Sequence, residues 1–434
     1  MKIWNRQYEC MPREEMEALQ LERLKESVQW AYDKVPMYRK KLDEAGVVPQ
    51  DIQRLSDIRK IPFTWKKELR DYYPYNNFAV PMNEVVRVHA SSGTTGKPIV
   101  VGYNRHDMEV WTELTARMVT AAGVTEGDIA QVSFGYGLFT GAFGLHYGLE
   151  RVGATVIPIS GGNTERQLMI MKDFEASALI CTPTYALHMA EVAQDLGIDP
   201  RKDLKVRLGL FGGEAWSEEY RRELNAAWNM NATDNYGLSE IMGPGVAGEC
   251  ELVCGQHIAE DHVLIEIIDS ETGNPVEPGQ PGEVVITTLT KQTVPMLRYR
   301  TRDISQINDA PCECGRHTAR MRKVTGRADD MLIIRGVNVF PSQIESVLID
   351  IEGLEPHYQI LIRRKGYLDE IEIQVEISPD WFSDKYAELE AVEEKLKHKL
   401  ASVLLIHPKV RLVEPKSIER VAGKAKRVVD LRGE

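Results

Sequence analysis

The sequence is short of several features, and each shortage narrows the class of protein. Six cysteines among 434 residues are too few for a disulfide-rich secreted scaffold. Acidic residues outnumber basic ones by 65 to 53, and the net charge of −12 argues against a broad nucleic-acid-binding surface. Internal repeats and low-complexity tracts are also missing. With 43% hydrophobic and 27% charged residues, the composition indicates a globular protein.

No secretory or membrane-spanning segment is expected either. Residues 1–6 lead into a charged helical stretch without the apolar run of a signal peptide. Residues 129–149 contain no Asp, Glu, Lys or Arg, and their length alone would admit a spanning helix. Their glycines and hydroxyl residues favour a buried strand, turn and helix instead. We therefore expect a cytoplasmic protein; a membrane-associated protein is the alternative, which solubility without detergent would test.

The chain is too long for one ordinary core, and its patterns predict an α/β protein with two domains. Between residues 85 and 234, short apolar runs alternate with helical stretches, which predicts a sheet with crossover helices. Strands at residues 263–268 and 282–287 indicate a small β subdomain at about 250–325. We expect the boundary near Asp329, with an N-terminal domain over residues 1–328 and a compact α+β domain over 329–434.

Periodic patterns predict helices and a strand near both ends of the chain. Residues 14–41 carry apolar side chains at helical spacing, and Pro36 predicts a kink or break. Residues 370–377 alternate strictly, as a half-buried strand does. Ser383 can cap the helix that follows. That helix has one apolar stripe, made of Tyr386, Leu389, Val392, Leu396 and Leu400.

The strongest local signal is a segment rich in glycine and hydroxyl residues that follows an expected strand at residues 85–88. Its backbone N–H groups can turn toward an anion, and its hydroxyls and lysine add donors for phosphate oxygens. It is not a Walker A loop, because Ser91 stands where that motif needs glycine and Pro98 follows the lysine. A P-loop kinase or GTPase is therefore disfavoured, and a plain polar turn is the alternative. The segment comprises Ser91, Ser92, Gly93, Thr94, Thr95, Gly96 and Lys97.

With this loop the sequence resembles the adenylate-forming superfamily, and further motifs of that superfamily follow in the expected order. They are an adenine-binding turn at residues 211–214, an aromatic-glycine motif at 235–240, a ribose-binding segment at 299–303, a hinge at 326–330 and a lysine motif at Gly423-Lys424. The resemblance implies that ATP is bound by the loop together with Gly213, Glu214, Asn235, Tyr236, Gly237, Ser239, Asp303 and Arg327. Taken singly, each motif has an ordinary structural explanation; Lys424 lies in a cationic run that is more often a solvated surface.

The resemblance implies a reaction in two steps. An ordinary carboxylic acid has a pKa near ~4 and is ionised at pH 7, so its attack on the α-phosphorus needs no base. Catalysis should then consist mainly of positioning the two anionic reactants and neutralising their charge. The resemblance assigns this to Mg²⁺ on Glu240, the phosphate loop and the catalytic Lys424. In this superfamily the C-terminal domain next rotates about a hinge, here Asp329, and Arg335 and Gly336 would bind coenzyme A. The sequence identifies no base for the thiol.

Within the superfamily, the sequence most resembles the phenylacetate–coenzyme A ligases, over nearly the whole chain. Residues 288–291 and 331–345 carry this likeness. A small aromatic acid needs a flat apolar slot, and residues 133–148 offer several aromatic rings among glycines. Candidate pocket residues are Tyr136, Phe139, Gly141 and Ala215, with ordinary core packing as the alternative. Coenzyme F390 synthetases look similar, so another carboxylate or cofactor is the second candidate. Related ligases are often homodimers, which implies a homodimer here.

Four of the six cysteines form two tight clusters, which in a cytoplasmic chain indicate a metal site before a disulfide. Two ligand pairs from two loops are typical of a closed, tetrahedral zinc site. By likeness to related ligases, the ligands are Cys250, His257, Cys312 and Cys314, with Cys254 as the alternative to Cys250. Such a site would join the β subdomain to the hinge region. A zinc-stabilised scaffold on a degenerate ligase fold is the rival function, in which Lys424→Ala would change nothing.

Overall fold

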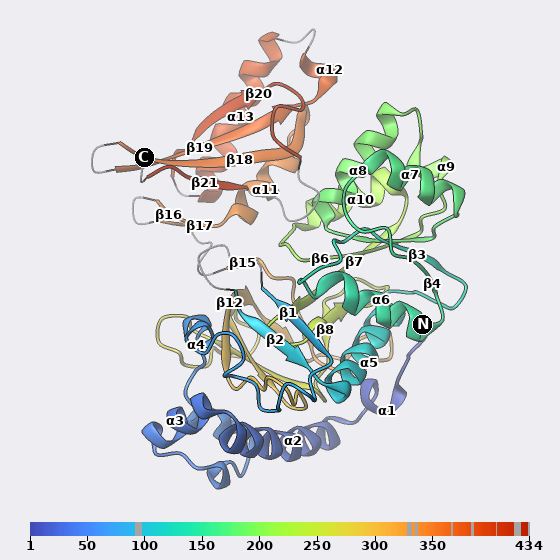
Figure 1. Cartoon of the computed structure of the whole chain (residues 1–434). Coiled ribbons are helices and arrows are strands. Elements are labelled where there is room, and N and C mark those ends of the chain that lie inside the picture. The colour runs from blue at the N-terminus through green and yellow to red at the C-terminus, as the bar shows by residue number, and fades with distance from the viewer. Residues whose placement is uncertain are drawn as a thin grey trace.

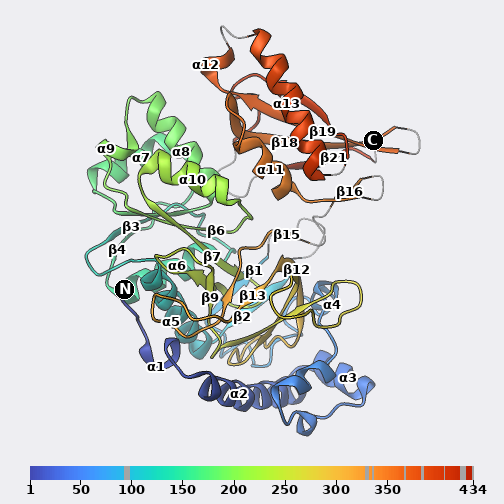
Figure 2. The same ribbon diagram turned by 180° about the vertical axis from the view of Figure 1, so that it is seen from behind.

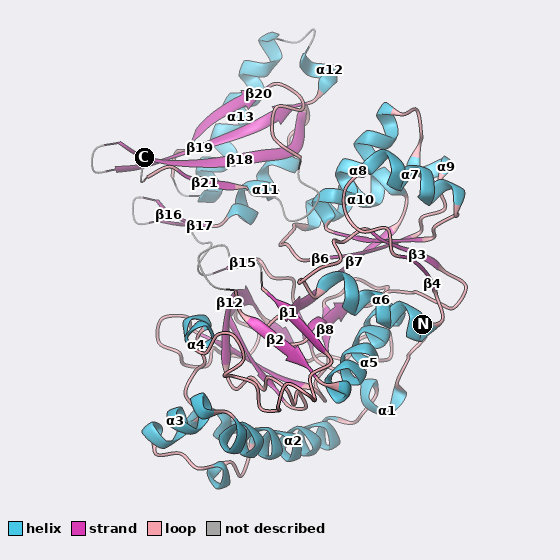
Figure 3. Ribbon diagram, in the orientation of Figure 1, coloured by secondary structure: helices cyan, strands magenta, loops and turns pink. Residues whose placement is uncertain are grey.

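A large N-terminal unit and a smaller C-terminal unit make up the described part of the molecule (Figure 1). The computed structural model describes residues 1–91, 98–327, 332–334, 337–365, 368–382, 386–404, 406–420 and 427–432. Helices and strands alternate through both units, as the view by secondary structure shows (Figure 3). The α/β class expected from the sequence is confirmed.

The N-terminal helices lie along one end of the large unit (Figure 2). The helix expected over residues 14–41 is broken at Val35, which is extended, because the Pro36 ring disfavours helical backbone in the residue before it. Leu24, Val28 and Tyr38 are buried in the same core as the strands of a small antiparallel sheet. The helices are α1 Arg6–Glu9, α2 Arg13–Lys34, α3 Pro36–Ala45 and α4 Lys66–Asp71, with 3-10 turns η1 Pro49–Asp51 and η2 Leu55–Lys60.

The central feature is a nine-stranded sheet in the order β13-β14-β9-β8-β7-β6-β5-β3-β4. The half from β4 to β7 is parallel, and the half from β8 to β13 is antiparallel. Its strands are β3 Ile129–Val132, β4 Thr155–Ile157, β5 Ala178–Cys181, β6 Leu208–Gly212, β7 Asn231–Leu238, β8 Gly243–Glu249, β9 Gln256–Ile258, β13 Ile307–Asn308 and β14 Arg320–Met321.

Helices cover both faces of the parallel half. On one face lie α5 Arg105–Ala121 and α6 Gly141–Val152, and on the other α7 Thr164–Asp173, α8 Pro183–Asp195 and α10 Glu218–Trp228, with the short α9 Pro200–Asp203 nearby. The uncharged residues 129–149 form strand β3 and most of α6, as the sequence predicts. Among the described residues, no helix has the length and apolar character needed to cross a bilayer.

Two smaller sheets complete the large unit. A four-stranded antiparallel sheet consists of β10 Val263–Ile268, β11 Gly282–Thr288, β12 Tyr299–Ser305 and β15 Gly326–Arg327. A separate hairpin pairs β1 Arg87–Ala90 with β2 Val100–Tyr103. The strand expected at residues 85–88 is thus displaced by two residues, because pairing with β2 begins at Arg87 while Val86 stays exposed.

The C-terminal unit is the expected α+β fold. Its sheet has the order β20-β19-β18-β21, and the strand expected at residues 370–377 lies within β19. Val392, Leu396 and Leu400 are buried against this sheet, while Ser383 lies outside the described residues. The elements are β16 Leu332–Ile334, β17 Val337–Val339, α11 Pro341–Ile349, β18 Leu354–Lys365, β19 Leu368–Ile377, α12 Pro379–Phe382, α13 Tyr386–Leu404, β20 Lys409–Val413 and β21 Val428–Asp430.

Candidate active site and metal centre

The candidate phosphate loop connects the two strands of the β1–β2 hairpin. The backbone N–H of Ser91 donates to the Ile99 oxygen at 2.9 Å, and Ser91 Oγ accepts from the Ile99 N–H at 3.1 Å. These bonds hold Ser91 and Ile99 next to each other at the end of the hairpin. Of the candidate loop residues, Ser91 is described; Ser92, Gly93, Thr94, Thr95, Gly96 and Lys97 lie outside the described part of the chain.

A tyrosine and a carboxylate from two different sheets meet at the candidate ribose position. The Tyr236 hydroxyl on β7 donates to Asp303 Oδ2 on β12 at 2.5 Å. Arg327 on β15 places its Nε 3.7 Å from the other carboxylate oxygen. Burial, followed by the charge of Asp303, raises the pKa of Tyr236, so the phenol stays protonated and donates. Three residues far apart in sequence therefore form one polar cluster.

The candidate adenine-binding turn follows strand β6. Gly213 has φ +85°, a backbone conformation that suits glycine, and a Cβ on Gly212 would lie 2.6 Å from the Asn235 backbone oxygen. The Asn235 amide donates to the Phe211 oxygen, which ties β7 to the turn. Glu214 Oε1 accepts from the Thr184 N–H at 2.9 Å. Gly213 and Ala215, by contrast, are exposed.

The turn between β7 and β8 carries the candidate metal-binding glutamate. A Cβ on Gly237 would lie 1.8 Å from the Gly243 oxygen, so only glycine fits this crossing. Ser239 Oγ lies 3.3 Å from Thr140 Oγ1 at the start of α6. Glu240 is 4% exposed, and its Oε1 makes no hydrogen bond. Lys66 Nζ of α4 lies 3.4 Å from that oxygen.

Two lysines at this turn had no role in the sequence prediction. Nothing in the sequence around Lys66 indicates a functional role, because lysines are common in charged helices. Lys291 was part of a motif but had no role; the structure shows its Nζ donating to the backbone oxygens of Glu240, at 3.1 Å, and of Ile241. Both contacts link segments distant in sequence, so spacing along the chain could not reveal them.

The candidate acid-pocket residues divide into two groups. Tyr136 is half-buried in an aromatic cluster, with its hydroxyl 3.0 Å from His146 Nδ1 and its ring 5.1 Å from that of Phe143. Burial raises the pKa of Tyr136, so its hydroxyl is protonated at neutral pH. Phe139 is instead 52% exposed, and Gly141 begins α6.

Arg87 extends the aromatic cluster toward strand β1. Its guanidinium lies 4.7 Å from the Phe143 ring centroid and donates to the Tyr147 hydroxyl at 2.6 Å. Nothing in the sequence pattern singles out this arginine.

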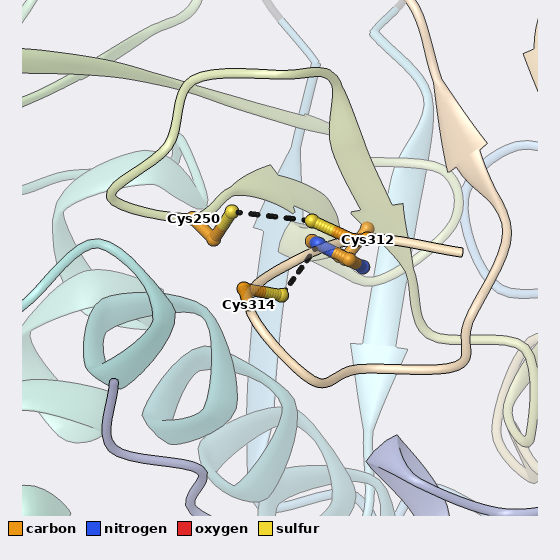
Figure 4. A group of neighbouring side chains, drawn as sticks. Cys250, Cys312 and Cys314 are labelled. Carbon is orange, nitrogen blue, oxygen red and sulfur yellow. Dashed lines mark hydrogen bonds between the residues drawn. The ribbon is translucent and has the colours of Figure 1, made fainter. Parts of the chain in front are cut away.

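Four of the candidate metal-binding side chains converge (Figure 4). The ligand atoms of Cys250, His257, Cys312 and Cys314 all lie within 4.8 Å of one another, and all four residues are buried. Cys250 Sγ is 4.0 Å from Cys312 Sγ, and Cys314 Sγ is 3.3 Å from His257 Nε2. Ligands around one zinc ion at about 2.0–2.3 Å would be separated by similar distances. Three sulfurs and one nitrogen therefore fit a tetrahedral zinc site.

Neighbouring contacts support the histidine as a ligand. His257 Nδ1 lies 3.0 Å from Thr318 Oγ1, so the second ring nitrogen is held, as is typical of metal-binding histidines. Cys254 is exposed, and its Sγ is 3.3 Å from that of Cys312. This cysteine is not among the four converging residues.

The location of this cluster differs from the expectation. The expected β subdomain grouped the cysteine loops with the strands of the four-stranded sheet, but β9 and β14 extend the antiparallel half of the nine-stranded sheet. The reason is pairing: His257 on β9 pairs with Arg320 on β14, and β9 pairs with β8. Arg316 pairs with Glu9 of α1, so the cluster lies next to the N-terminal helices.

The remaining candidate residues lie outside the described part of the chain. These are Asp329 at the expected hinge, Arg335 and Gly336 for coenzyme A, and Lys424. The two units nevertheless touch through described residues: Glu345 Oε1 of α11 accepts from the Ser217 N–H at 3.1 Å, and Glu191 of α8 contacts His357 of β18.

The doubly covered sheet, the glycine-rich turns at its edge and the second α+β unit define an adenylate-forming enzyme fold. Residues 13–290 match the family model described as AMP-binding enzyme, and residues 336–432 match the AMP-binding enzyme C-terminal domain. The chain belongs to the AMP-binding enzyme family.

Within this family, the chain is similar over nearly its whole length to phenylacetate-coenzyme A ligases. The phenylacetate-coenzyme A ligase of Thermus thermophilus is 47% identical over 444 residues, which cover 99% of this chain and 100% of that protein. The enzymes of the same name from Escherichia coli and Pseudomonas putida are 47% and 49% identical, covering 96% and 95% of this chain and 95% and 93% of theirs. The chain is an acid–thiol ligase.

Solved structures of a 2-hydroxyisobutyryl-CoA ligase share the fold. In its postadenylation state, that enzyme aligns with a TM-score of 0.93 at 29% identity, covering 99% of this chain and 92% of the other. In its thioesterification state, in complex with 2-HIB-AMP and CoA, the TM-score is 0.74 at 30% identity, covering 99% of this chain and 93% of the other. Because both are the same enzyme, the arrangement of units in this chain is nearer to the postadenylation state.

Proposed function

We propose that the protein joins an aryl acid, phenylacetate in particular, to coenzyme A in an ATP-dependent reaction that passes through an acyl-adenylate. The observation that carries this proposal is the 47–49% identity to four phenylacetate-coenzyme A ligases over 93–100% of their lengths. The expected products are the acyl-coenzyme A thioester, AMP and pyrophosphate.

ATP binding is assigned to the polar groups at the sheet edges. Asp303, held by Tyr236 and near Arg327, presents a carboxylate that can accept hydrogen bonds from both ribose hydroxyls. The turn at Gly213 and Glu214, with Asn235 and Gly237, lines the adenine side. Ser91 to Lys97, with Ser239, would donate to phosphate oxygens.

Glu240 is the proposed Mg²⁺ ligand. Its buried Oε1 has no hydrogen-bond partner and faces the ammonium of Lys66, so the position already attracts a cation. Bound there, Mg²⁺ would neutralise negative charge on the triphosphate.

In the first step, a carboxylate oxygen of the acid attacks the α-phosphorus. A bond forms between that oxygen and phosphorus, the bond to the bridging oxygen breaks, and pyrophosphate leaves. The acid enters as an anion, so no proton is moved and the protein needs to align two anions rather than supply a base. We propose that Lys424, the catalytic lysine, supplies positive charge in addition to Mg²⁺ to stabilise the transition state.

In the second step, the coenzyme A sulfur attacks the acyl carbon, and AMP leaves. A free thiol has a pKa near ~8.5, so its proton is lost during attack. Arg335 and Gly336 are the proposed coenzyme A contacts, and Asp329 is the proposed hinge that lets residues 329–434 turn between the steps.

For the acid, we propose a slot that includes Tyr136, Phe139, Gly141 and Ala215. Tyr136 and Phe143 meet edge to face, the arrangement that aromatic pairs favour, and the ring of the acid would pack against them. The exposed Phe139 would close over the bound acid.

We also propose a structural zinc ion held by Cys250, His257, Cys312 and Cys314. A cytoplasmic location and a homodimer complete the proposal, by likeness to the relatives.

Pyrophosphate release tests the function directly. Purified protein is incubated with ATP, Mg²⁺ and phenylacetate, with and without coenzyme A. We expect release that requires the acid, and phenylacetyl-coenzyme A that forms only when coenzyme A is present. If no acid of an aryl and aliphatic panel drives release, the adenylating function is wrong for those acids, and a coenzyme F390-type substrate or a scaffold role takes its place.

A further inference from the structure

Lys291 is a buried lysine whose ammonium contacts the turn that carries Glu240. It follows β11 and is 2% exposed. Its Nζ donates to the backbone oxygens of Glu240 and Ile241, the first at 3.1 Å. Among the described residues, no carboxylate oxygen lies within 4.0 Å of this nitrogen. The donors of a buried cation are thus directed to two carbonyls of one turn, rather than to a counter-ion.

The loop that presents Lys291 is itself fixed on the start of helix α5. Asp107 accepts from the N–H groups of Gln292, at 2.7 Å, and Thr293, at 2.9 Å. Thr290 Oγ1 lies 2.7 Å from His262 Nδ1. Because the residues on both sides of Lys291 are held, its ammonium has a defined place from which to hold the turn.

The surroundings keep the ammonium charged near neutral pH. Burial lowers the pKa of Lys291 to about 8, opposed by the charges of Asp107 and Glu240. The Tyr103 ring lies 5.0 Å from Nζ and offers its face to the cation.

The carboxylate of Glu240 contacts two side chains, Tyr299 through a hydrogen bond and Lys66 through its charge. Oε1 has no hydrogen bond, and its neighbouring cation, Lys66, is a side chain 39% exposed to solvent. The direction of the carboxylate also depends on the backbone of residues 239–242, and Lys291 binds that backbone.

We propose that Lys291 is a positioning residue for adenylation, which holds the Glu240–Ile241 backbone so that the Glu240 carboxylate faces the metal of Mg·ATP. This inference rests on the proposed function. Outer partners of metal ligands affect metal affinity about 10–100-fold, and a displacement of about 1 Å in an active site can lower a rate about 100-fold.

The test compares Lys291→Met with wild-type protein in acid-dependent pyrophosphate release, without coenzyme A, over a range of Mg²⁺ concentrations. We expect half-saturating Mg²⁺ to rise about tenfold and kcat to fall on the order of 100-fold. Arg316→Met is the matched control: this buried cation pairs with Glu9 of α1, next to the cysteine cluster. It should lose thermal stability while keeping the wild-type Mg²⁺ dependence.

A double-mutant cycle with Glu240→Gln separates positioning from general destabilisation. If Lys291 acts through Glu240, then Lys291→Met should add little in the Glu240→Gln background. Additive losses, or a folded Lys291→Met variant with wild-type Mg²⁺ dependence, would overturn the inference. Should Lys291→Met not fold, Lys291→Gln, whose amide can keep one bond to the turn, is judged by the same criteria. Absence of pyrophosphate release from wild-type protein would instead count against the proposed function.

Discussion

At the scale of single residues, the candidate ATP site depends on a few side chains whose partners come from other sheets. Tyr236 and Asp303 are the clearest pair, because a protonated phenol and an ionised carboxylate meet at 2.5 Å in a buried place. Hydrogen bonds to charged groups contribute about 1.5–3 kcal/mol, more than bonds between neutral groups. The orientation of the proposed ribose-binding carboxylate should therefore depend on this one hydroxyl.

Replacing Tyr236 by Phe removes that hydroxyl and keeps the ring. We expect the KM for ATP to rise about tenfold, because Asp303 loses the donor that fixes it. Steady-state pyrophosphate release at varied ATP measures this. Tyr32→Phe is the matched control, since the Tyr32 hydroxyl also donates to a carboxylate, Asp43, but on the exposed surface. Equal KM values for both variants would contradict the role of Tyr236.

Lys291 also predicts a pH dependence of stability. Its pKa is lowered to about 8 in the folded protein from an unfolded value near ~10.4, so between these values the unfolded chain binds more protons. Wild-type stability relative to Lys291→Met should then increase by about 2 kcal/mol from about pH 7.5 to 9.5. Chemical unfolding of both proteins at the two pH values measures the gap, with Lys202→Met, at an exposed lysine, as control. If the free energy of unfolding of wild type minus that of Lys291→Met decreases as pH rises, the lowered pKa of Lys291 is contradicted.

At the scale of elements, the cysteine cluster ties the turn after β8 and strand β9 to the loop before β14. These segments are held by short strands, since β9 has three residues and β14 has two. Such strands offer few ladder bonds of their own, and a bound ion would supply the missing cross-link.

Removal of the proposed zinc should therefore loosen this end of the sheet. We expect Cys314→Ser to lose bound zinc and to lower the unfolding temperature by several degrees, because Cys314 is one of the four converging ligands. Elemental analysis and thermal unfolding are the measurements. Cys254→Ser and Cys10→Ser should both retain the metal. Zinc loss from Cys254→Ser, with retention in Cys250→Ser, would make Cys254 the ligand.

At the scale of the whole molecule, a set of charged contacts joins the two units. Glu191 on α8 contacts His357, lies 3.6 Å from Arg420 Nε, and lies 3.5 Å from His188 of its own helix. Burial opposes ionisation of Glu191, yet hydrogen bonds from His188 and His357 hold its pKa well below its usual range. The carboxylate is thus charged and paired in the arrangement that is nearer to the postadenylation state.

Removing this carboxylate should shift the balance between arrangements. We expect Glu191→Ala to slow pyrophosphate release about fivefold relative to thioester formation, since a partly exposed pair contributes about 1 kcal/mol. Single-turnover measurements of each step give the ratio. Asp195→Ala is the matched control, because its pair with Lys416 is well exposed and should contribute little. A ratio that changes equally in both variants would argue against a special role for Glu191.

The sequence by itself determined the kinds of elements and their order. Residues 263–268 and 282–287 are strands as predicted, because apolar runs between turn residues leave few other conformations. The break before Pro36 follows from the proline ring, and the four converging side chains were candidates because of the clustering of cysteines and family likeness.

Only the tertiary structure decided which of these elements meet. The sequence could not show that β9 joins the large sheet, that Tyr236 donates to Asp303, or that Lys291 holds the turn at Glu240. Neither could it choose between Cys250 and Cys254 from spacing alone, since both are close enough to His257 along the chain. The physical reason is that local patterns set backbone conformation within a few residues, whereas contacts between distant segments depend on how the sheets and helices pack as a whole.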